Sequence, residues 1–293
     1  DRMQIMSRTE TKKNEESAGL SVELGALDPE TGFLESLDDI VDRLCVPRFA
    51  LDLDHRVLCR ERIEDSAVAD LDDVRLVPYP LFYDHGWHMD LAALAARITP
   101  RTRAVVVVHP NNPTGHFTSL AERLALERIC LERGLVLIVD EVFLDYTLDL
   151  PDAPASTRPL RMASFASGQH PVLTYVLSGL SKVAGLPQMK ASWIAAFGPE
   201  PFFKEANARL EVIADTFLSM NAPVQHALPY LLAHRSSVQQ QILLRVQENL
   251  ATLDQRLAVA PTVSRLEIQG GWYAVLRVPA LMSGELLAIR LIE

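Results

Sequence analysis

Lys182 is the residue of this chain with the clearest potential for chemistry. It comes shortly after the apolar, β-branched run Val172–Leu177 and so lies at the end of an expected buried strand, where solvent-exposed lysines are uncommon. Hydroxyl groups of Ser178 and Ser181 stand near it in the sequence. A lysine held in such surroundings can form a Schiff base with an aldehyde cofactor. The same Ser-x-x-Ser-Lys spacing also fits an ordinary strand-to-loop turn.

Two further segments pair an apolar run with polar residues at its carboxyl end. Ala104–Val108 is continuously apolar and precedes the turn-forming cluster His109–Gly115. Leu135–Val139 is a second such run, and it is followed by Asp140. Strands of this kind, separated by helical stretches, predict a parallel α/β sheet whose ligand site lies beyond the carboxyl ends of the strands.

Three motifs occur in a characteristic order along the chain. They are Asn-Pro-Thr-Gly at residues 112–115, Asp-Glu-Val at 140–142 and Ser-Lys-x-x-Gly-Leu-Pro at 181–187. Their content and order resemble the fold-type I, class I/II aminotransferases that use pyridoxal phosphate, and the match covers about Leu71–Pro279. The resemblance implies an α/β fold with a mostly parallel central sheet flanked by helices. It also implies a second, smaller α/β domain, of which only part is expected in this chain.

The resemblance assigns roles to the motif residues. Lys182 would carry pyridoxal 5'-phosphate as a Schiff base and then move the proton between the substrate α-carbon and the cofactor. Asp140 would keep the pyridine nitrogen protonated so that the ring accepts electrons. Such a charge-assisted bond is worth roughly 1.5–3 kcal/mol. Asn112 would lie beside the phenolic oxygen. Without the other motifs, Asp140 could be a turn or capping residue, and Asn-Asn-Pro-Thr-Gly is simply a good turn sequence.

Three positions depart from the family pattern. Phe143 stands where the family usually has a tyrosine that donates to the phenolic oxygen, and loss of that bond, worth roughly 1 kcal/mol, should raise the pKa of the imine. Lys190 replaces the expected phosphate-binding arginine and keeps its charge without the bidentate fork. Gly179 replaces a common hydroxyl residue. This leaves Ser181, with Ser178 as a second candidate, to bind the phosphate.

Some family features are not found. Residues 1–70 show no Ser/Thr/Gly-rich phosphate loop, and no convincing arginine for the substrate carboxylate follows Gly270–Pro279. Two explanations are open, namely that segments are missing or that the chain is a degenerate relative, and we expect missing segments. The organisation predicted is an N-terminal arm with a poorly matched segment (1–70), a large cofactor-binding domain (71–235), and a connector helix with the start of a small domain (236–293). Within the first part, residues 1–30 are expected to form a flexible arm.

Composition narrows the class of protein. The chain has 293 residues, 48% of them hydrophobic, which is enough for a large core. Its net charge of −10 argues against nucleic-acid binding. Its three cysteines form no Cys-x-x-Cys pair, and the start lacks the apolar segment of a signal peptide. No run reaches membrane-spanning length, and the histidines lack metal-ligand spacing. The expectation is a cytoplasmic protein that does not bind membranes or metals.

The function expected is amino-group transfer between an amino acid and a 2-oxo acid. A same-fold decarboxylase or lyase, a non-catalytic member that binds pyridoxal phosphate, and an unrelated α/β protein remain as alternatives. No Arg or Lys occurs between Ala214 and Pro223, which favours a neutral or hydrophobic amino donor over a dicarboxylate. The family assembles its site between two subunits, and the apolar faces of Pro199–Leu218 and Ala222–Ala233 favour a homodimer.

Overall fold

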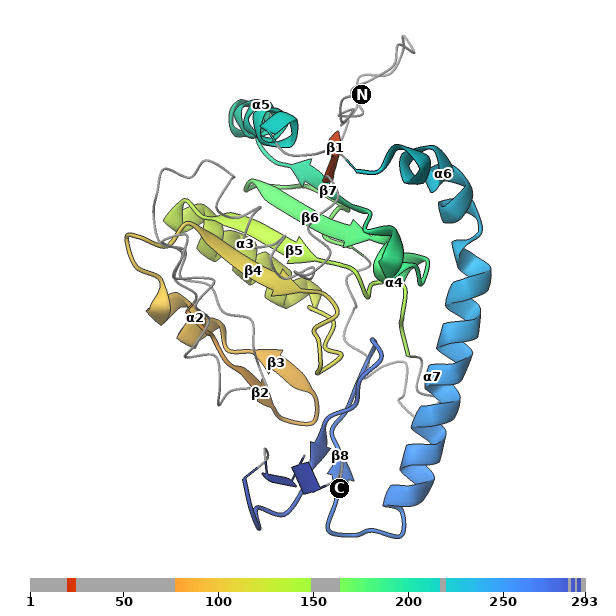
Figure 1. Ribbon diagram of the computed structural model, residues 1–293. Helices are drawn as coiled ribbons and strands as arrows, with labels where there is room; N and C mark the ends of the chain where they lie inside the picture. The colour runs from red at the N-terminus through yellow and green to blue at the C-terminus, as the bar shows by residue number, and fades with distance from the viewer. Residues whose placement is uncertain are drawn as a thin grey trace.

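The centre of the molecule is a five-stranded sheet in an α/β arrangement (Figure 1). The computed structural model describes residues 20–24, 77–148, 164–216, 220–283, 286, 287, 289 and 290. In spatial order the strands are β1 (Leu20–Leu24), β7 (Ser192–Phe197), β6 (Thr174–Gly179), β5 (Val136–Asp140) and β4 (Ala104–Val108). Strands β4, β5 and β6 are parallel, and β7 runs antiparallel to both β6 and β1. The predicted mostly parallel sheet is confirmed.

The sheet is buried on both faces, which explains why its strands read as continuous apolar runs. On one face Ile138 and Tyr175 pack with Leu210 of α5 (Glu200–Thr216). On the other face Val107 packs with Leu126 of α3 (Leu120–Arg133). Two layers of helices therefore hold the strands in place and fix where their carboxyl ends lie.

Local sequence signals set the ends of the helices on the second face. Ser119 caps α3 and forms a capping box with Glu122, and Gly134 ends the helix in the left-handed conformation. The short helix α2 (Leu91–Arg97) begins after the cap Asp90. It follows a hairpin of β2 (Leu81–Tyr83) and β3 (Trp87–Met89), which lies beside α2 in Figure 1.

A long helix borders the sheet on one side. After α6 (Ala222–Ala233), α7 runs from Arg235 to Leu257 along the molecule (Figure 1). Its inner face carries Val246, Leu250 and Leu253, which pack with Leu148 and Ile268. A helix is present where the connector helix is expected, while its connecting role and the domain boundaries remain predictions.

The prediction of a flexible N-terminal arm is wrong for Leu20–Leu24. These residues form β1 and pair with β7, so that Leu20 lies opposite Ala196 and Leu24 opposite Ser192. Their sequence, Leu-Ser-Val-Glu-Leu, alternates apolar and polar residues as an edge strand does. The rest of the predicted arm lies outside the described residues.

The C-terminal segment folds back onto the carboxyl edge of the sheet. It contains the short paired strands β8 (Ser264–Arg265) and β9 (Leu276–Arg277), and the loop between them reaches up towards β5 and α4 (Leu180–Val183) in Figure 1. Gln269 N donates to Gly115 O at 3.2 Å, and Gly271 N donates to Tyr146 O at 2.9 Å. The loop thus joins the Asn-Pro-Thr-Gly turn to the segment that follows Asp140.

We expect Gly115→Ala to destabilise the fold by about 2–4 kcal/mol. Gly115 has φ +68°, and a Cβ there would collide with the carbonyl group of Gly270. Gly134→Ala is the matched control, because Gly134 has φ +64° with no atom within 4 Å of its Cβ position. This control should cost only about 1–2 kcal/mol, the intrinsic cost of the left-handed conformation. Equal losses in chemical denaturation would contradict the tight contact with Gly270.

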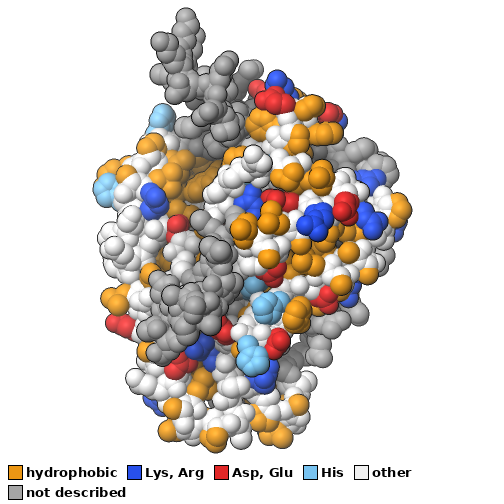
Figure 2. Space-filling model, turned by 180° about the vertical axis from the view of Figure 1, so that it is seen from behind, with side chains coloured by type: hydrophobic (Ala, Val, Ile, Leu, Met, Phe, Trp, Pro, Cys, Tyr) orange, Lys and Arg blue, Asp and Glu red, His pale blue; other side chains and the backbone are white. Residues whose placement is uncertain are grey.

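The surface seen in Figure 2 carries charged side chains of both signs. Acidic and basic side chains lie next to one another on the far face of the molecule (Figure 2). Among the described helices, none combines the length and apolarity needed to cross a bilayer. The described residues also contain no group of three or more His, Cys, Asp or Glu side chains placed to hold a metal ion.

Candidate active site

Lys182 lies where the sequence places it, at the carboxyl edge of the sheet. β6 ends at Gly179, and the four-residue helix α4 follows at once and carries Lys182. The side chain is half-buried. Its Nζ lies over two aromatic rings, 5.3 Å from the centroid of Phe143 and 4.8 Å from that of Trp272. Both distances allow cation–π attraction, so the amine is held among rings and not free in solvent.

Asp140 ends the neighbouring strand β5 and is 6% exposed. Burial raises the pKa of its carboxyl to about 6, although the N–H of Val142 and the charge of Lys182 both favour the ionised form. Val142 N donates to Asp140 Oδ1 at 2.9 Å. The motif residues Asp140 and Lys182 therefore interact electrostatically at the ends of adjacent strands.

The backbone around Lys182 is fixed by two side chains from other segments. Tyr146 Oη donates to Lys182 O at 2.6 Å. Gln239 on α7 donates to Val183 O and to Asp145 Oδ2, both at 2.8 Å. These bonds connect the lysine turn to the segment after Asp140 and to the long helix, so they position the lysine without touching its amine.

Glu141 forms a second buried carboxylate behind the site. Its oxygens accept from Phe165 N at 2.6 Å and from Ser164 Oγ at 2.7 Å. Burial raises the pKa of Glu141 to about 7, against these bonds and the charge of Arg123. Arg123 in turn bonds to Glu127 at 2.7 Å and stacks on Phe165. Glu141 thus holds residues 164 and 165 against the end of β5.

The remaining predicted cofactor residues take different positions. Phe143 is 3% exposed and lines the lysine, Ser181 is half-buried on α4, and Asn112 and Lys190 are exposed. Lys190 ends a short 3-10 helix, η1 (Pro187–Met189), with φ +49°. The structure therefore brings Lys182, Asp140 and Phe143 together and leaves Asn112 and Lys190 open to solvent. It does not test their binding roles.

Close packing of the neighbouring strand explains why position 179 is a glycine. A Cβ at this position would lie 2.8 Å from the carbonyl oxygen of Ala191 and 3.0 Å from Cβ of Ser192. The hydroxyl residue that the family often carries there would therefore require β6 and β7 to separate. The replacement noted in the sequence follows from close strand packing.

Two aromatic residues of the site were not predicted from the sequence. Tyr146 follows the turn that comes after β5, which ends at Asp140. Trp272 lies in the loop between β8 and β9. The sequence signal that could have found it is the pair Gly270-Gly271 directly before it, since two glycines in succession allow a close backbone approach.

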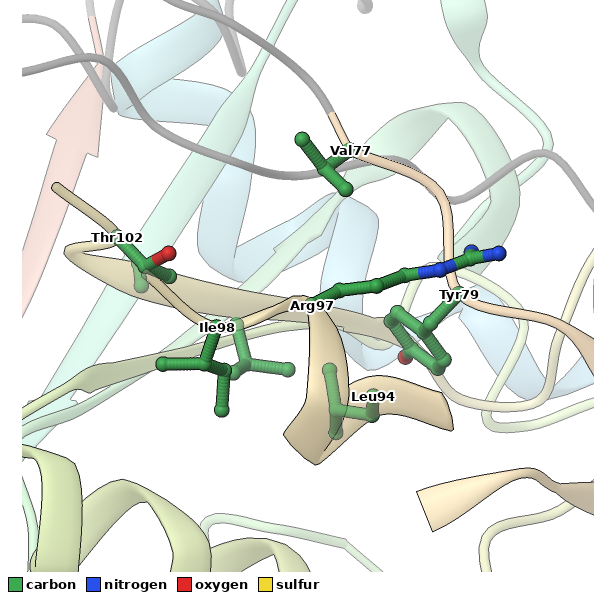
Figure 3. A pocket seen from close by; sticks show the side chains of 8 residues that line it. Val77, Tyr79, Leu94, Arg97, Ile98 and Thr102 are labelled. Carbon is green, nitrogen blue, oxygen red and sulfur yellow. The ribbon is translucent and has the colours of Figure 1, made fainter. Parts of the chain in front are cut away.

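A separate hollow beside β4 takes no part in this arrangement (Figure 3). Tyr79, whose Oη bonds to Val106 O at 3.0 Å, closes one side of it. Its walls share no residue with the lysine site and are lined by Val77, Tyr79, Leu94, Arg97, Ile98, Thr102, Ala104 and Val105.

Comparison with known proteins agrees with the geometry. The sequence profile of the family described as aminotransferase class I and II matches residues 66–293. The chain belongs to the class I and II aminotransferase family. The matched region of this aminotransferase chain contains all three motifs. The family match therefore confirms the resemblance to the class I/II aminotransferases.

Characterised relatives are distant and longer. Alanine aminotransferase of Mycobacterium tuberculosis is 29% identical over 197 residues, which are 66% of this chain and 43% of that protein. Glutamate-pyruvate aminotransferase of Escherichia coli is 28% identical over 217 residues, 73% of this chain and 51% of that protein. The aminotransferase chain thus spans about half the length of these relatives.

Solved structures share the fold. Alanine aminotransferase from Pyrococcus furiosus superposes with a TM-score of 0.68 at 18% identity, covering 90% of this chain and 62% of that one. Cystalysin from Treponema denticola gives a TM-score of 0.66 at 14% identity, covering 88% and 64%. These superpositions show that the aminotransferase chain has the fold-type I architecture.

Proposed function

We propose that the protein is a pyridoxal-phosphate-dependent aminotransferase that moves an amino group between an amino acid and a 2-oxo acid. The observation that carries the proposal is the pairing of Lys182 and Asp140 at the carboxyl ends of adjacent strands. One is an amine enclosed by aromatic rings, and the other is a buried carboxyl that feels the charge of that amine. Family membership and the relatives named as aminotransferases support it.

The residues present fit pyridoxal 5'-phosphate by the chemistry of their donor groups. An aldehyde requires a primary amine, which Lys182 supplies. A pyridine nitrogen requires an acid partner shielded from water, and Asp140 is such an acid. A flat ring requires apolar walls, and Phe143 and Trp272 provide them. Ser181 and the exposed Lys190 are the hydroxyl and cation proposed for the phosphate, and Asn112 is proposed for the ring oxygen.

Each residue has a defined task in the proposed reaction. When bound, pyridoxal phosphate supplies an aldehyde that condenses with amines and a ring that accepts the electrons of the substrate α-carbon. Lys182 would hold the cofactor and would move a proton from and to the α-carbon of the substrate. Asp140 would keep the proton on the ring nitrogen. Tyr146 holds the backbone of Lys182 in place.

The test is a half-reaction followed by absorbance. Protein loaded with pyridoxal phosphate and mixed with an amino acid should lose its visible band as the amine form of the cofactor accumulates, and a 2-oxo acid should restore the band. Release of carbon dioxide or ammonia without the amine form would instead support the decarboxylase or lyase alternative. A band that responds to no amino acid would indicate a non-catalytic binder, and no visible band would contradict the proposal.

We expect a neutral amino donor such as alanine to be used at least about tenfold better than aspartate, measured as kcat/KM. The stretch from Ala214 to Pro223 offers no basic side chain for a second carboxylate, and the relatives are named for alanine and for glutamate-pyruvate transfer. A donor panel that compares alanine, leucine, glutamate and aspartate measures this. Preference for aspartate would show that a cation outside this stretch binds the side chain.

We also propose that the active form is a cytoplasmic homodimer. Large apolar side chains are exposed on the outer helices, including Phe202 (64%), Val212 (67%) and Tyr230 (66%), and such surfaces commonly mark interfaces. Light scattering at micromolar concentration should give twice the mass of the chain. Full activity in a monomer would contradict the proposal. The buried free thiol of Cys130 fits a reducing compartment.

A further inference from the structure

Trp272 enters the lysine site from a distant part of the chain and is held there firmly. The preceding loop is tied to the sheet edge by backbone bonds at Gln269 and Gly271. The indole lies edge-on to two further rings, with centroids 5.2 Å from Phe143 and 5.0 Å from Tyr146. Its own face lies 4.8 Å from Lys182 Nζ. The orientation of the indole is therefore fixed next to the amine.

The indole N–H of Trp272 has no acceptor. It is shielded from solvent, and no oxygen or nitrogen of the described residues accepts from it. A buried donor left unpaired is costly, and such a group in a native protein requires an explanation. Of the three rings packed here, Phe143 has no polar atom, and Tyr146 already donates to Lys182 O. Tyr273, which also packs on Phe143, is exposed, so Trp272 supplies the buried donor without an acceptor among the described rings around Phe143.

Trp87 and Trp272 both have a buried indole N–H without an acceptor among the described residues, but they differ in what surrounds them. Trp87 lies on β3 against the ring of Tyr83. Only Trp272 of these two contacts the amine at which the proposed cofactor and substrate are held. Its ring therefore lies beside the position that the proposed cofactor and substrate would occupy.

We propose that the Trp272 indole N–H is a hydrogen-bond donor to an anionic oxygen of the group bound at Lys182. The inference rests on the proposed function. Two sources offer this chemistry, namely an oxygen of pyridoxal phosphate and the carboxylate of the amino-acid substrate. In either case Trp272 is a binding residue of the site as well as part of its apolar wall, and the loop between β8 and β9 contributes directly to the reaction centre.

The test combines a direct observation of the N–H with variants that remove it. The chain has three tryptophans, so a protein labelled with ¹⁵N-indole gives few signals, and Trp272→Phe assigns the relevant one. Pyridoxal phosphate is added first and L-alanine second, with the dissociation constant of the cofactor and the half-saturation by alanine measured alongside. Trp87→Phe is the matched control, since it removes the other unpaired indole N–H. A variant with β-(3-benzothienyl)alanine at position 272 keeps the shape and removes only the donor.

Each result has a defined meaning. A downfield shift of the Trp272 signal with pyridoxal phosphate alone, with cofactor binding weakened about tenfold in both position-272 variants, supports the proposal with the cofactor as acceptor. A shift only after alanine, with half-saturation raised about tenfold and cofactor binding unchanged, supports it with the carboxylate as acceptor. A signal that neither ligand moves, with position-272 variants that behave like Trp87→Phe, overturns it. Wild-type protein that binds no cofactor overturns both this inference and the proposed function.

Discussion

Lys182→Ala is expected to abolish the visible absorbance of the protein with pyridoxal phosphate and to lower amino-group transfer by at least about a thousandfold. The amine is removed from its position over the rings of Phe143 and Trp272, whereas Lys190, which lies two residues before β7, is exposed to solvent. The fold should persist, because Lys182 contributes its carbonyl, and not its side chain, to the bond with Tyr146.

The control for this variant is Lys204→Ala. Lys204 is exposed and pairs with Glu200 within α5, so its loss should change neither the absorbance nor turnover. Circular dichroism of Lys182→Ala should match that of the parent protein. Retention of a band that borohydride can trap in Lys182→Ala would exclude Lys182 as the attachment point.

Asp140→Asn is expected to impair the reaction and at the same time to stabilise the cofactor-free fold. Without a negative partner for the ring nitrogen, removal of the α-proton should slow roughly 100-fold, while cofactor affinity falls less than about tenfold. Stopped-flow absorbance gives the first quantity, and titration of the cofactor gives the second. Near-normal transfer would mean that Asp140 only shapes the turn.

The stability effect follows from the direction of the pKa shift. Burial raises the pKa of Asp140 from about 3.8 to about 6, so the folded state binds this proton more tightly than the unfolded state does. The protonated carboxyl therefore stabilises the fold fully below pH 4, and this contribution disappears as the pH rises to about 6. At pH 8 the neutral amide should make the cofactor-free protein more stable by on the order of 2–3 kcal/mol. Equal denaturation midpoints at pH 8 would contradict the strong burial of the charge.

Those parts of the fold that depend on local pattern could be predicted from the sequence. The β-branched runs that become β4, β5 and β6 are buried on both faces, and each ends at a polar motif. The helix α3 carries its start and stop in Ser119 and Gly134. The edge strand β1 could not be predicted because it is short and directly follows a polar stretch. Its partner β7 comes from far along the chain, and no local signal records that pairing.

The residues of the site also separate into those that could be predicted from the sequence and those that could not. Lys182 and Asp140 could be predicted because their chemistry shows in the residue type and in the strand that precedes each of them. Trp272 and Tyr146 could not, because their roles arise from packing between segments that are distant in sequence. The sequence shows two glycines before Trp272, but it does not show that Gly270 lies against the turn at Gly115.

The central claim is that Lys182 is the amine that holds the cofactor next to Asp140. Borohydride reduction of the protein with bound pyridoxal phosphate, followed by mass mapping of the peptides, tests it most directly. The chain has few lysines, at positions 12, 13, 182, 190 and 204, so the assignment is unambiguous. We predict a single reduced adduct on Lys182. An adduct on Lys190 or Lys204 in its place, or no adduct at all, would contradict the account.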